Sequence, residues 1–136
     1  MGAHTDYTTY TLLYADPVPG LQIIGPSGDW IDVIPQPGSL LMNVGDLLAM
    51  WTNDRWPSTL HRVIPMAQGG AARRRSVAWF HYPDLDTTVA PLSGFIGDDG
   101  AHYPAVRVDD HVRGKLGSPK TLSDPTSAST VQNRAT

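Results

Sequence analysis

Residues 7–14 read YTTYTLLY, a stretch dense in Thr and Tyr that favours an extended strand. A second such run, RRSVAWFHY, occupies residues 74–82. Shorter runs of the same kind, separated by Gly- and Pro-containing turns, predict strands at residues 21–24, 30–34 and 60–64. Residues 39–51 contain good helix formers, but Gly45 and Asp46 at their centre favour two strands joined by a tight turn.

The composition also favours an all-β domain. The 136 residues suffice for one domain, and 40% of them are hydrophobic, so a core can form. All 13 acidic residues are Asp, and 13 Gly and 12 Pro supply turn formers at the expense of helix formers. Short strands with regular turns predict a sandwich or jelly roll. Residues 106–116 predict one short amphipathic helix, and the aperiodic residues 116–136 predict a disordered tail.

Several functional classes are disfavoured. The net charge of −3 and the absence of a basic face argue against nucleic acid as a partner. No run of about 18 apolar residues is present, so no membrane span is expected. The absence of Cys removes disulfides and thiolate chemistry and is compatible with a cytoplasmic location. Phosphate-binding loops, Gly-rich dinucleotide turns, the His-Glu-x-x-His motif and the Gly-x-Ser-x-Gly motif are also missing.

The segment His4-Thr5-Asp6 is a candidate for chemistry, although the His-x-Asp pattern by itself is a weak signal that also fits a polar pair at the end of a surface strand. In an extended chain, residues i and i+2 point to the same side, so His4 and Asp6 present an imidazole and a carboxylate together. One further imidazole would complete a facial site of two His and one carboxylate, which leaves open positions on iron. His61 is a candidate for that ligand, although a lone His between apolar residues is more often a packed one. His81, His102 and His111 have no better context.

Longer blocks carry a resemblance to a known family. Residues 4–13 (HTDYTTYTLL), 19–23 (PGLQI), 30–33 (WIDV), 43–53 (NVGDLLAMWTN), 58–63 (STLHRV) and 74–80 (RRSVAWF) occur in this order. Together they resemble the isopenicillin N synthase-like family of Fe(II)/2-oxoglutarate-dependent oxygenases over residues 2–115. The resemblance implies a double-stranded β-helix (jelly roll) with a short C-terminal helix, and a catalytic domain at residues 1–115.

The same resemblance implies roles for individual residues. His4, Asp6 and His61 would bind Fe(II), and Arg74 and Ser76 would hold the distal carboxylate of 2-oxoglutarate. Elementary geometry agrees with the second pair, because residues i and i+2 of a strand share a face. A planar guanidinium also suits a carboxylate. Arg75 is expected on the opposite face of the strand.

The implied function is oxidation of a C–H bond in a small-molecule substrate with release of succinate and CO₂. Two alternatives stay open: an oxidase that takes its electrons from substrate or ascorbate instead of 2-oxoglutarate, and a non-catalytic jelly-roll remnant. Family members are much longer, and the first jelly-roll strand is missing from this N-terminally truncated pattern. An unpaired sheet edge is therefore expected beside the strand that carries Arg74 and Ser76, together with self-association through it. Fraying at His4 is expected to weaken iron binding.

Overall fold

The computed structural model describes residues 1–64 and 73–117, and short antiparallel strands dominate it, as the composition predicts. The strands are β1 (Tyr10–Ala15), β2 (Leu21–Ile24), β3 (Trp30–Asp32), β4 (Leu41–Val44), β5 (His61–Val63), β6 (Ser76–His81), β7 (Thr88–Val89) and β8 (Val106–Arg107). The helices are α1 (Asp46–Trp51), the 3₁₀ turn η1 (Ser93–Phe95) and α2 (Val108–Gly117). None of these helices is both long enough and apolar enough to cross a membrane.

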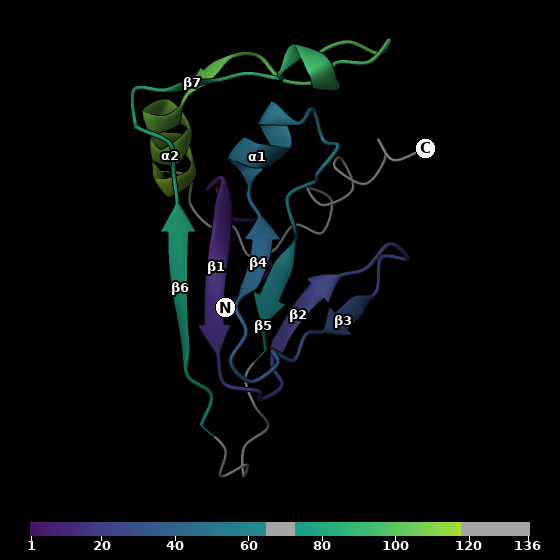
Figure 1. Ribbon diagram of the computed structural model, residues 1–136, viewed down its shortest axis with the longest axis vertical. Helices are drawn as coiled ribbons and strands as arrows, with labels where there is room; N and C mark the ends of the chain where they lie inside the picture. Colours follow the sequence, from purple (N-terminus) through teal and green to yellow (C-terminus); the bar gives the residue numbers. More distant parts are fainter. Residues whose placement is uncertain (65–72, 118–136) are drawn as a thin grey trace.

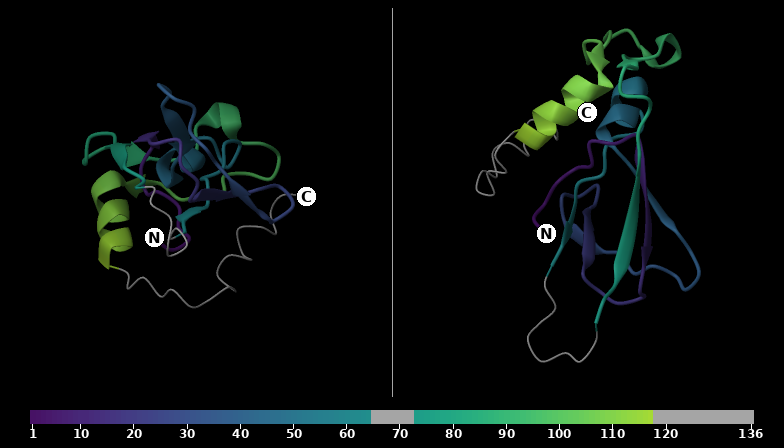
Figure 2. Two further views of the ribbon diagram at one scale, coloured as in Figure 1. Left: turned by 90° about the horizontal axis from the view of Figure 1, so that it is seen from below. Right: turned by 90° about the vertical axis from the view of Figure 1, so that its left-hand side faces the viewer.

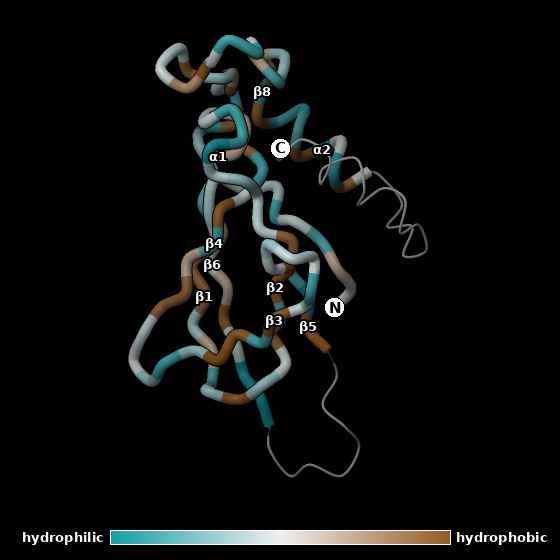
Figure 3. The backbone as a smooth tube through the Cα atoms, turned by 90° about the vertical axis from the view of Figure 1, so that its right-hand side faces the viewer, coloured by the Kyte–Doolittle hydropathy of each residue, from teal (hydrophilic) through white to brown (hydrophobic). Residues whose placement is uncertain are grey.

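Two three-stranded sheets form the body of the molecule. Their strand orders are β4-β1-β6 and β3-β2-β5, and every pairing is antiparallel. The sheets lie as two layers, with α1, α2 and the β7–β8 pair at one end (Figures 1 and 2). Figure 3 shows the layers from the side, with apolar stretches on strands of both sheets. This arrangement leaves the facing surfaces of the sheets to line a cavity.

The register of the first sheet assigns its residues to two faces. Thr11 on β1 lies opposite Asn43 on β4 and Phe80 on β6, and these three residues line the cavity between the sheets. Alternate residues point outward. The outward set includes the exposed side chains of Tyr14, Val77 and Trp79. The outer face of this sheet is therefore apolar and open to solvent.

The fully buried core lies at the helical end. Leu47 of α1, Val89 of β7 and Val108 of α2 have no exposed surface. Met50, Trp51, Tyr82, Val106 and Val112 pack around them. The core therefore fixes α2 and the β7–β8 pair against α1, next to the sheet that carries β1.

The prediction for residues 39–51 is wrong in its second half, because only β4 is a strand and α1 follows it. The first N–H groups of a helix lack partners within it. Here the backbone N–H groups of Gly45, Asp46 and Leu47 are accepted by the carbonyls of Thr9, Asp6 and Thr8 at 2.7–3.0 Å. The bend that brings these carbonyls to α1 also makes β1 begin at Tyr10, three residues later than residue 7.

The C-terminal part departs slightly from the sequence-based prediction. The helix predicted over residues 106–116 is α2, with the preceding two residues forming β8. The stretch between residue 83 and this helix, for which no element was predicted, contains β7 and η1. Helix α2 ends at Gly117, so the rest of the predicted tail, residues 118–136, lies outside the described residues.

Strand β6 lies at the edge of its sheet, with β1 as its partner among the described strands. The unpaired edge expected beside Arg74 and Ser76 is therefore confirmed within this part of the chain. The side chains of Trp79 and Phe80 on this strand are 56% and 49% exposed. The physical reason is that no described element packs on the outer face of β6, while Phe80 faces the open cavity.

Candidate metal centre

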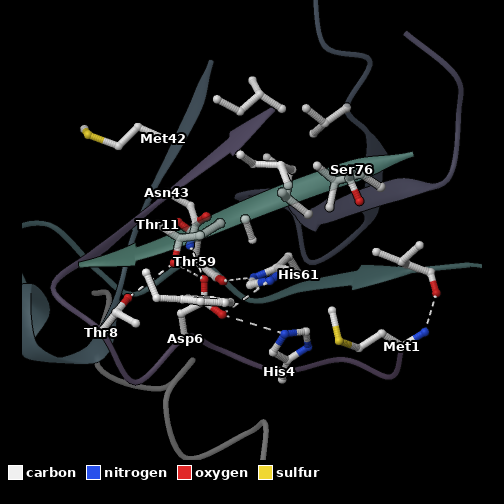
Figure 4. Close-up of a pocket in the computed structure, with 18 of the residues that line it drawn as sticks. Met1, His4, Asp6, Thr8, Thr11, Met42, Asn43, Thr59, His61 and Ser76 are labelled. Carbon is white, nitrogen blue, oxygen red and sulfur yellow. Dashed lines mark hydrogen bonds and ion pairs between the residues drawn. The ribbon is translucent and has the colours of Figure 1, made fainter. Parts of the chain in front are cut away.

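His4, Asp6 and His61 come together in the structure (Figure 4). The backbone N–H and C=O of His4 both pair with His61, each at 3.0 Å, in an isolated antiparallel bridge. This bridge sets the two rings side by side, with centroids 4.3 Å apart. The Nε2 atoms of His4 and His61 lie 3.8 and 3.7 Å from Oδ1 of Asp6. The backbone at His4 is thus paired, contrary to the fraying expected there.

The tautomers of both imidazoles follow from their partners. Nδ1 of His4 lies 2.8 Å from the carbonyl of Gly2, and Nδ1 of His61 lies 2.9 Å from the carbonyl of Thr59. A carbonyl can only accept, so each Nδ1 carries the proton and donates. In the neutral rings the Nε2 lone pairs then face the carboxylate. Three electron-rich atoms converging without a proton between them repel one another unless a cation binds there, so this donor set fits a metal ion.

The second oxygen of Asp6 is held separately. Its Oδ2 accepts hydrogen bonds from the Thr11 hydroxyl at 2.6 Å and from the Asn43 amide at 2.9 Å. Asp6 and Thr11 are buried, and Asn43 is half-buried. No local sequence pattern distinguishes Thr11 or Asn43 as functional residues. The signal that identifies them is their cross-strand pairing, which places both donors on one face.

The triad opens into a cavity of about 460 Å³ between the two sheets. Much of its wall is apolar, with side chains of Leu13, Leu21, Ile23, Val33, Leu41, Val63, Ala78 and Phe80. Figure 4 shows Ser76 on β6 across the pocket from the Asp6 carboxylate, with His61 between them in the view. The cavity therefore joins a polar metal-ligand cluster to a largely apolar wall.

Arg74 and Ser76 both line this cavity, as their shared face predicts. The Nη1 atom of Arg74 donates to the Ser76 hydroxyl at 3.4 Å. Its Nε and Nη2 atoms are buried and have no hydrogen-bond partner among the described residues. A guanidinium is always charged, and a buried charge without a partner is costly. The arrangement is therefore suited to an anion that enters the cavity and accepts from Arg74.

Arg75 points away from the cavity, also as predicted. Its backbone N–H and Nε both donate to Oδ2 of Asp16, at 2.8 and 3.3 Å, and its side chain is 87% exposed. These hydrogen bonds, the backbone one first, hold the pKa of Asp16 below its ordinary value. Arg75 is therefore satisfied at the surface, whereas Arg74 is not satisfied in the cavity.

The remaining histidines have other surroundings. His81 stacks on Tyr10, with centroids 4.5 Å apart. His102 lies between two carboxylates, with Nδ1 3.0 Å from Asp54 and Nε2 2.7 Å from Asp99. Those two hydrogen bonds, Asp99 first, raise its pKa. Within the described residues, the metal-binding grouping of His and Asp is His4, Asp6 and His61.

Sequence comparison connects this geometry to known proteins. The profile of the 2OG-Fe(II) oxygenase superfamily matches residues 1–83. A 2-oxoglutarate-Fe(II) type oxidoreductase, hxnY of Emericella nidulans, is 40% identical over 84% of this chain and 32% of its own length. 1-Aminocyclopropane-1-carboxylate oxidase 3 of Arabidopsis thaliana is 37% identical over 82% of this chain and 33% of its own. The chain spans about a third of the length of these relatives.

Solved structures give the same result. A full-length Neurospora crassa protein, in complex with alpha-KG (2-oxoglutarate) and 5-formyluracil, superposes with a TM-score of 0.79 and 33% identity, covering 87% of this chain and 39% of that one. The dioxygenase for auxin oxidation from rice superposes with a TM-score of 0.75 and 34% identity, covering 85% and 39%. By profile, sequence and structure, the chain belongs to the 2OG-Fe(II) oxygenase superfamily.

Proposed function

We propose that this chain carries the cofactor site of a non-haem Fe(II)/2-oxoglutarate-dependent oxygenase that acts on a small molecule. His4, Asp6 and His61 would hold Fe(II), and Arg74 with Ser76 would hold the distal carboxylate of 2-oxoglutarate. One observation supports this most: the three converging metal donors and the unpartnered guanidinium of Arg74 line the same cavity. Membership of the superfamily is consistent with both cofactors.

The chemistry would divide between cofactor and protein. Bound Fe(II) with 2-oxoglutarate and O₂ would supply the oxidation of a substrate C–H bond, with one oxygen atom ending in succinate and CO₂ released. The two imidazoles and the carboxylate orient the metal and leave positions open on one side. Arg74 orients the co-substrate through charge-assisted hydrogen bonds, which are strong where water is excluded. The apolar side chains around them would exclude water from the reacting centre.

We also propose that the two sheets are part of a jelly roll. Two facing antiparallel sheets and the superposition on oxygenase structures support a partial double-stranded β-helix, with residues 1–115 as its catalytic part. A cytoplasmic location stays a prediction from the sequence.

A second candidate function is an oxidase of the same superfamily that does not consume 2-oxoglutarate. The similarity of this chain to 1-aminocyclopropane-1-carboxylate oxidase 3 supports this second candidate. A catalytically silent remnant is the third candidate. Two measurements distinguish the three candidate functions. One is whether the chain binds 2-oxoglutarate, and the other is whether a substrate stimulates decarboxylation of 2-oxoglutarate.

The direct test is anaerobic titration of the purified chain with Fe(II) and then 2-oxoglutarate, following the weak visible charge-transfer band of the chelate. We expect the wild-type chain to develop the band. His61→Ala should abolish it by removing a metal ligand, and Arg74→Ala should shift its appearance to much higher 2-oxoglutarate concentration. Arg75→Ala is the matched control, because this neighbouring arginine pairs with Asp16 at the surface.

The outcomes separate the readings. A band that is lost in His61→Ala and weakened in Arg74→Ala but not in Arg75→Ala supports the proposal. Metal binding without 2-oxoglutarate binding favours the oxidase. A folded chain that binds neither ligand contradicts the proposal and favours the remnant.

We further propose that the chain self-associates through β6. The support is the position of β6 at the sheet edge together with the exposed apolar side chains of Val77 and Trp79 beside it. Open edges with apolar flanks pair readily with other chains.

A further inference from the structure

The carboxylate of Asp6 has two oxygens in different surroundings. Oδ1 faces Nε2 of His4 and His61, at 3.8 and 3.7 Å, and receives no hydrogen bond from any described residue. Oδ2 accepts two hydrogen bonds, from Thr11 and Asn43. Each oxygen of an ionised carboxylate offers about two lone-pair sites. The two donors therefore saturate Oδ2 and leave Oδ1 free.

We propose that Thr11 and Asn43 are positioning residues that force Asp6 to bind the metal through Oδ1 alone. This inference rests on the proposed function of the triad. A carboxylate that bound through both oxygens would occupy one of the positions that a facial triad leaves open. Keeping Oδ2 engaged thus preserves that position for co-substrate and O₂.

The pairing of strands in the sheet sets the positions of the two hydrogen-bond donors. Thr11 and Asn43 are direct cross-strand partners in the β1–β4 ladder, so both reach Oδ2 from one face. Thr8 adds a further constraint, because its hydroxyl lies 3.3 Å from that of Thr11 and both are buried. Since an ionised carboxylate only accepts, the Thr11 proton is committed to Asp6, and Thr8 donates to Thr11. Figure 4 shows Thr8, Thr11 and Asn43 grouped beside Asp6, away from His4.

The chain contains a matched control for Thr11. Thr9 is equally buried, at 5% against 3% exposed, and its hydroxyl has no hydrogen-bond partner within the described residues. It does not line the cavity. Replacing Thr9 by Val therefore removes a buried threonine hydroxyl without touching Asp6, whereas Thr11→Val removes one of the two donors.

The experiment is titration of the full 136-residue chain with Co(II), a spectroscopic stand-in for Fe(II), following both the dissociation constant and the visible ligand-field band. The intensity of this band depends on the number of atoms that coordinate Co(II). The band therefore reports whether Asp6 binds the metal through one oxygen or through two. We expect Thr11→Val to weaken Co(II) binding by about 10- to 100-fold, the usual loss when a hydrogen-bond partner of a metal ligand is removed. The band should change in shape and intensity as well. Thr11→Ser should restore both readouts, and Thr9→Val should match the wild type.

Asn43→Ala supplies an independent variant, since Asn43 is half-buried and its truncation leaves no hole in the apolar core. Thermal unfolding of the metal-free proteins checks that each variant folds; if Thr11→Val does not, Asn43→Ala decides alone. Wild-type affinity and an unchanged band in the folded variants would overturn the positioning role while leaving the metal site intact. A wild-type chain that binds no Co(II) would instead overturn the metal site, and the positioning role with it.

Discussion

The burial of His111 predicts that the stability of the folded chain depends on pH. It is buried on α2, and its Nε2 has no hydrogen-bond partner in the described part of the chain. Burial lowers its pKa from the ordinary 6.5; nearby Asp46 opposes this shift and Lys115 adds to it. Between the lowered pKa and 6.5, the unfolded chain binds more protons at this site than the folded chain. The contribution of His111 to stability is therefore complete above about pH 6.5 and lost as the pH falls below it.

We predict that replacing His111 by Leu reduces this loss of folding stability at acidic pH. The measurement is urea unfolding of the wild type and His111→Leu at a series of pH values from 7.5 to 5. The free energy of unfolding of the wild type should fall relative to the variant as the pH decreases. Parallel curves would show that His111 does not titrate as its burial implies.

His102 should behave in the opposite sense. The carboxylates of Asp99 and Asp54 stabilise its charged form and raise its pKa. A raised pKa means that the folded chain binds more protons than the unfolded chain above pH 6.5. The stabilising contribution is therefore present below pH 6.5 and lost as the pH rises through the raised pKa. His102→Gln should cost stability at pH 6 and progressively less toward pH 9, measured by urea unfolding; a constant difference would contradict the assignment.

Individual ligand residues were predictable where the pattern is local. The spacing of His4 and Asp6 follows from the two-residue period of an extended chain. His61 came from the family resemblance, because its surroundings in sequence do not distinguish it from a packed histidine. Thr11 and Asn43 were missed, since their role depends on lying opposite each other in a ladder between strands far apart in sequence.

At the scale of elements, the junction between β4 and α1 depends on one glycine. A Cβ built on Gly45 would lie 2.3 Å from the carbonyl oxygen of Thr8 and 2.6 Å from its hydroxyl. The backbone of Gly45 is at φ −103°, which any residue adopts, so the requirement is for space and not for a left-handed conformation. We predict that Gly45→Ala destabilises the chain by about 1–3 kcal/mol, the usual cost of overpacking. Chemical denaturation measures this loss.

Because the Thr8 hydroxyl bonds to that of Thr11, Gly45→Ala should also weaken Co(II) binding by displacing Thr8. Gly114 is the control: it lies inside α2, and a Cβ there would meet nothing within 4 Å. Gly114→Ala should stabilise the chain by about 0.5–1 kcal/mol through helix propensity. Equal effects of the two substitutions would contradict the close-approach explanation for Gly45.

Local sequence propensity predicted some elements more accurately than others. Strand β2 has the predicted bounds, because Leu21–Ile24 is a short apolar run closed by turn residues on both sides. Helix α1 was misread because Gly45 and Asp46 suggested a hairpin turn. Their actual role is to begin a helix whose N–H groups are accepted by the carbonyls of residues 6–9, a contact that no local pattern reveals.

At the scale of the whole molecule, the exposed face and edge of β6 predict self-association. Val77 is 68% exposed on the outer face, so Val77→Lys should fold normally and reduce association, because lysine on an edge strand opposes pairing. Analytical ultracentrifugation over a range of concentrations measures the effect. Leu116→Lys is the control, since Leu116 is similarly exposed but lies on α2. A wild-type chain that is monomeric at all concentrations would contradict the proposed association.

The sequence by itself determined the all-β character, most strand positions, the pairing of His4 with Asp6 on one side and of Arg74 with Ser76 on one face. These properties follow from composition and from the two-residue period of an extended chain. Only the tertiary structure decided that His4 lies opposite His61, that Thr11 and Asn43 share one oxygen of Asp6, and that Trp79 is exposed. The physical reason is that strand register and the packing of one layer on another depend on contacts between residues distant in sequence, which no local pattern specifies.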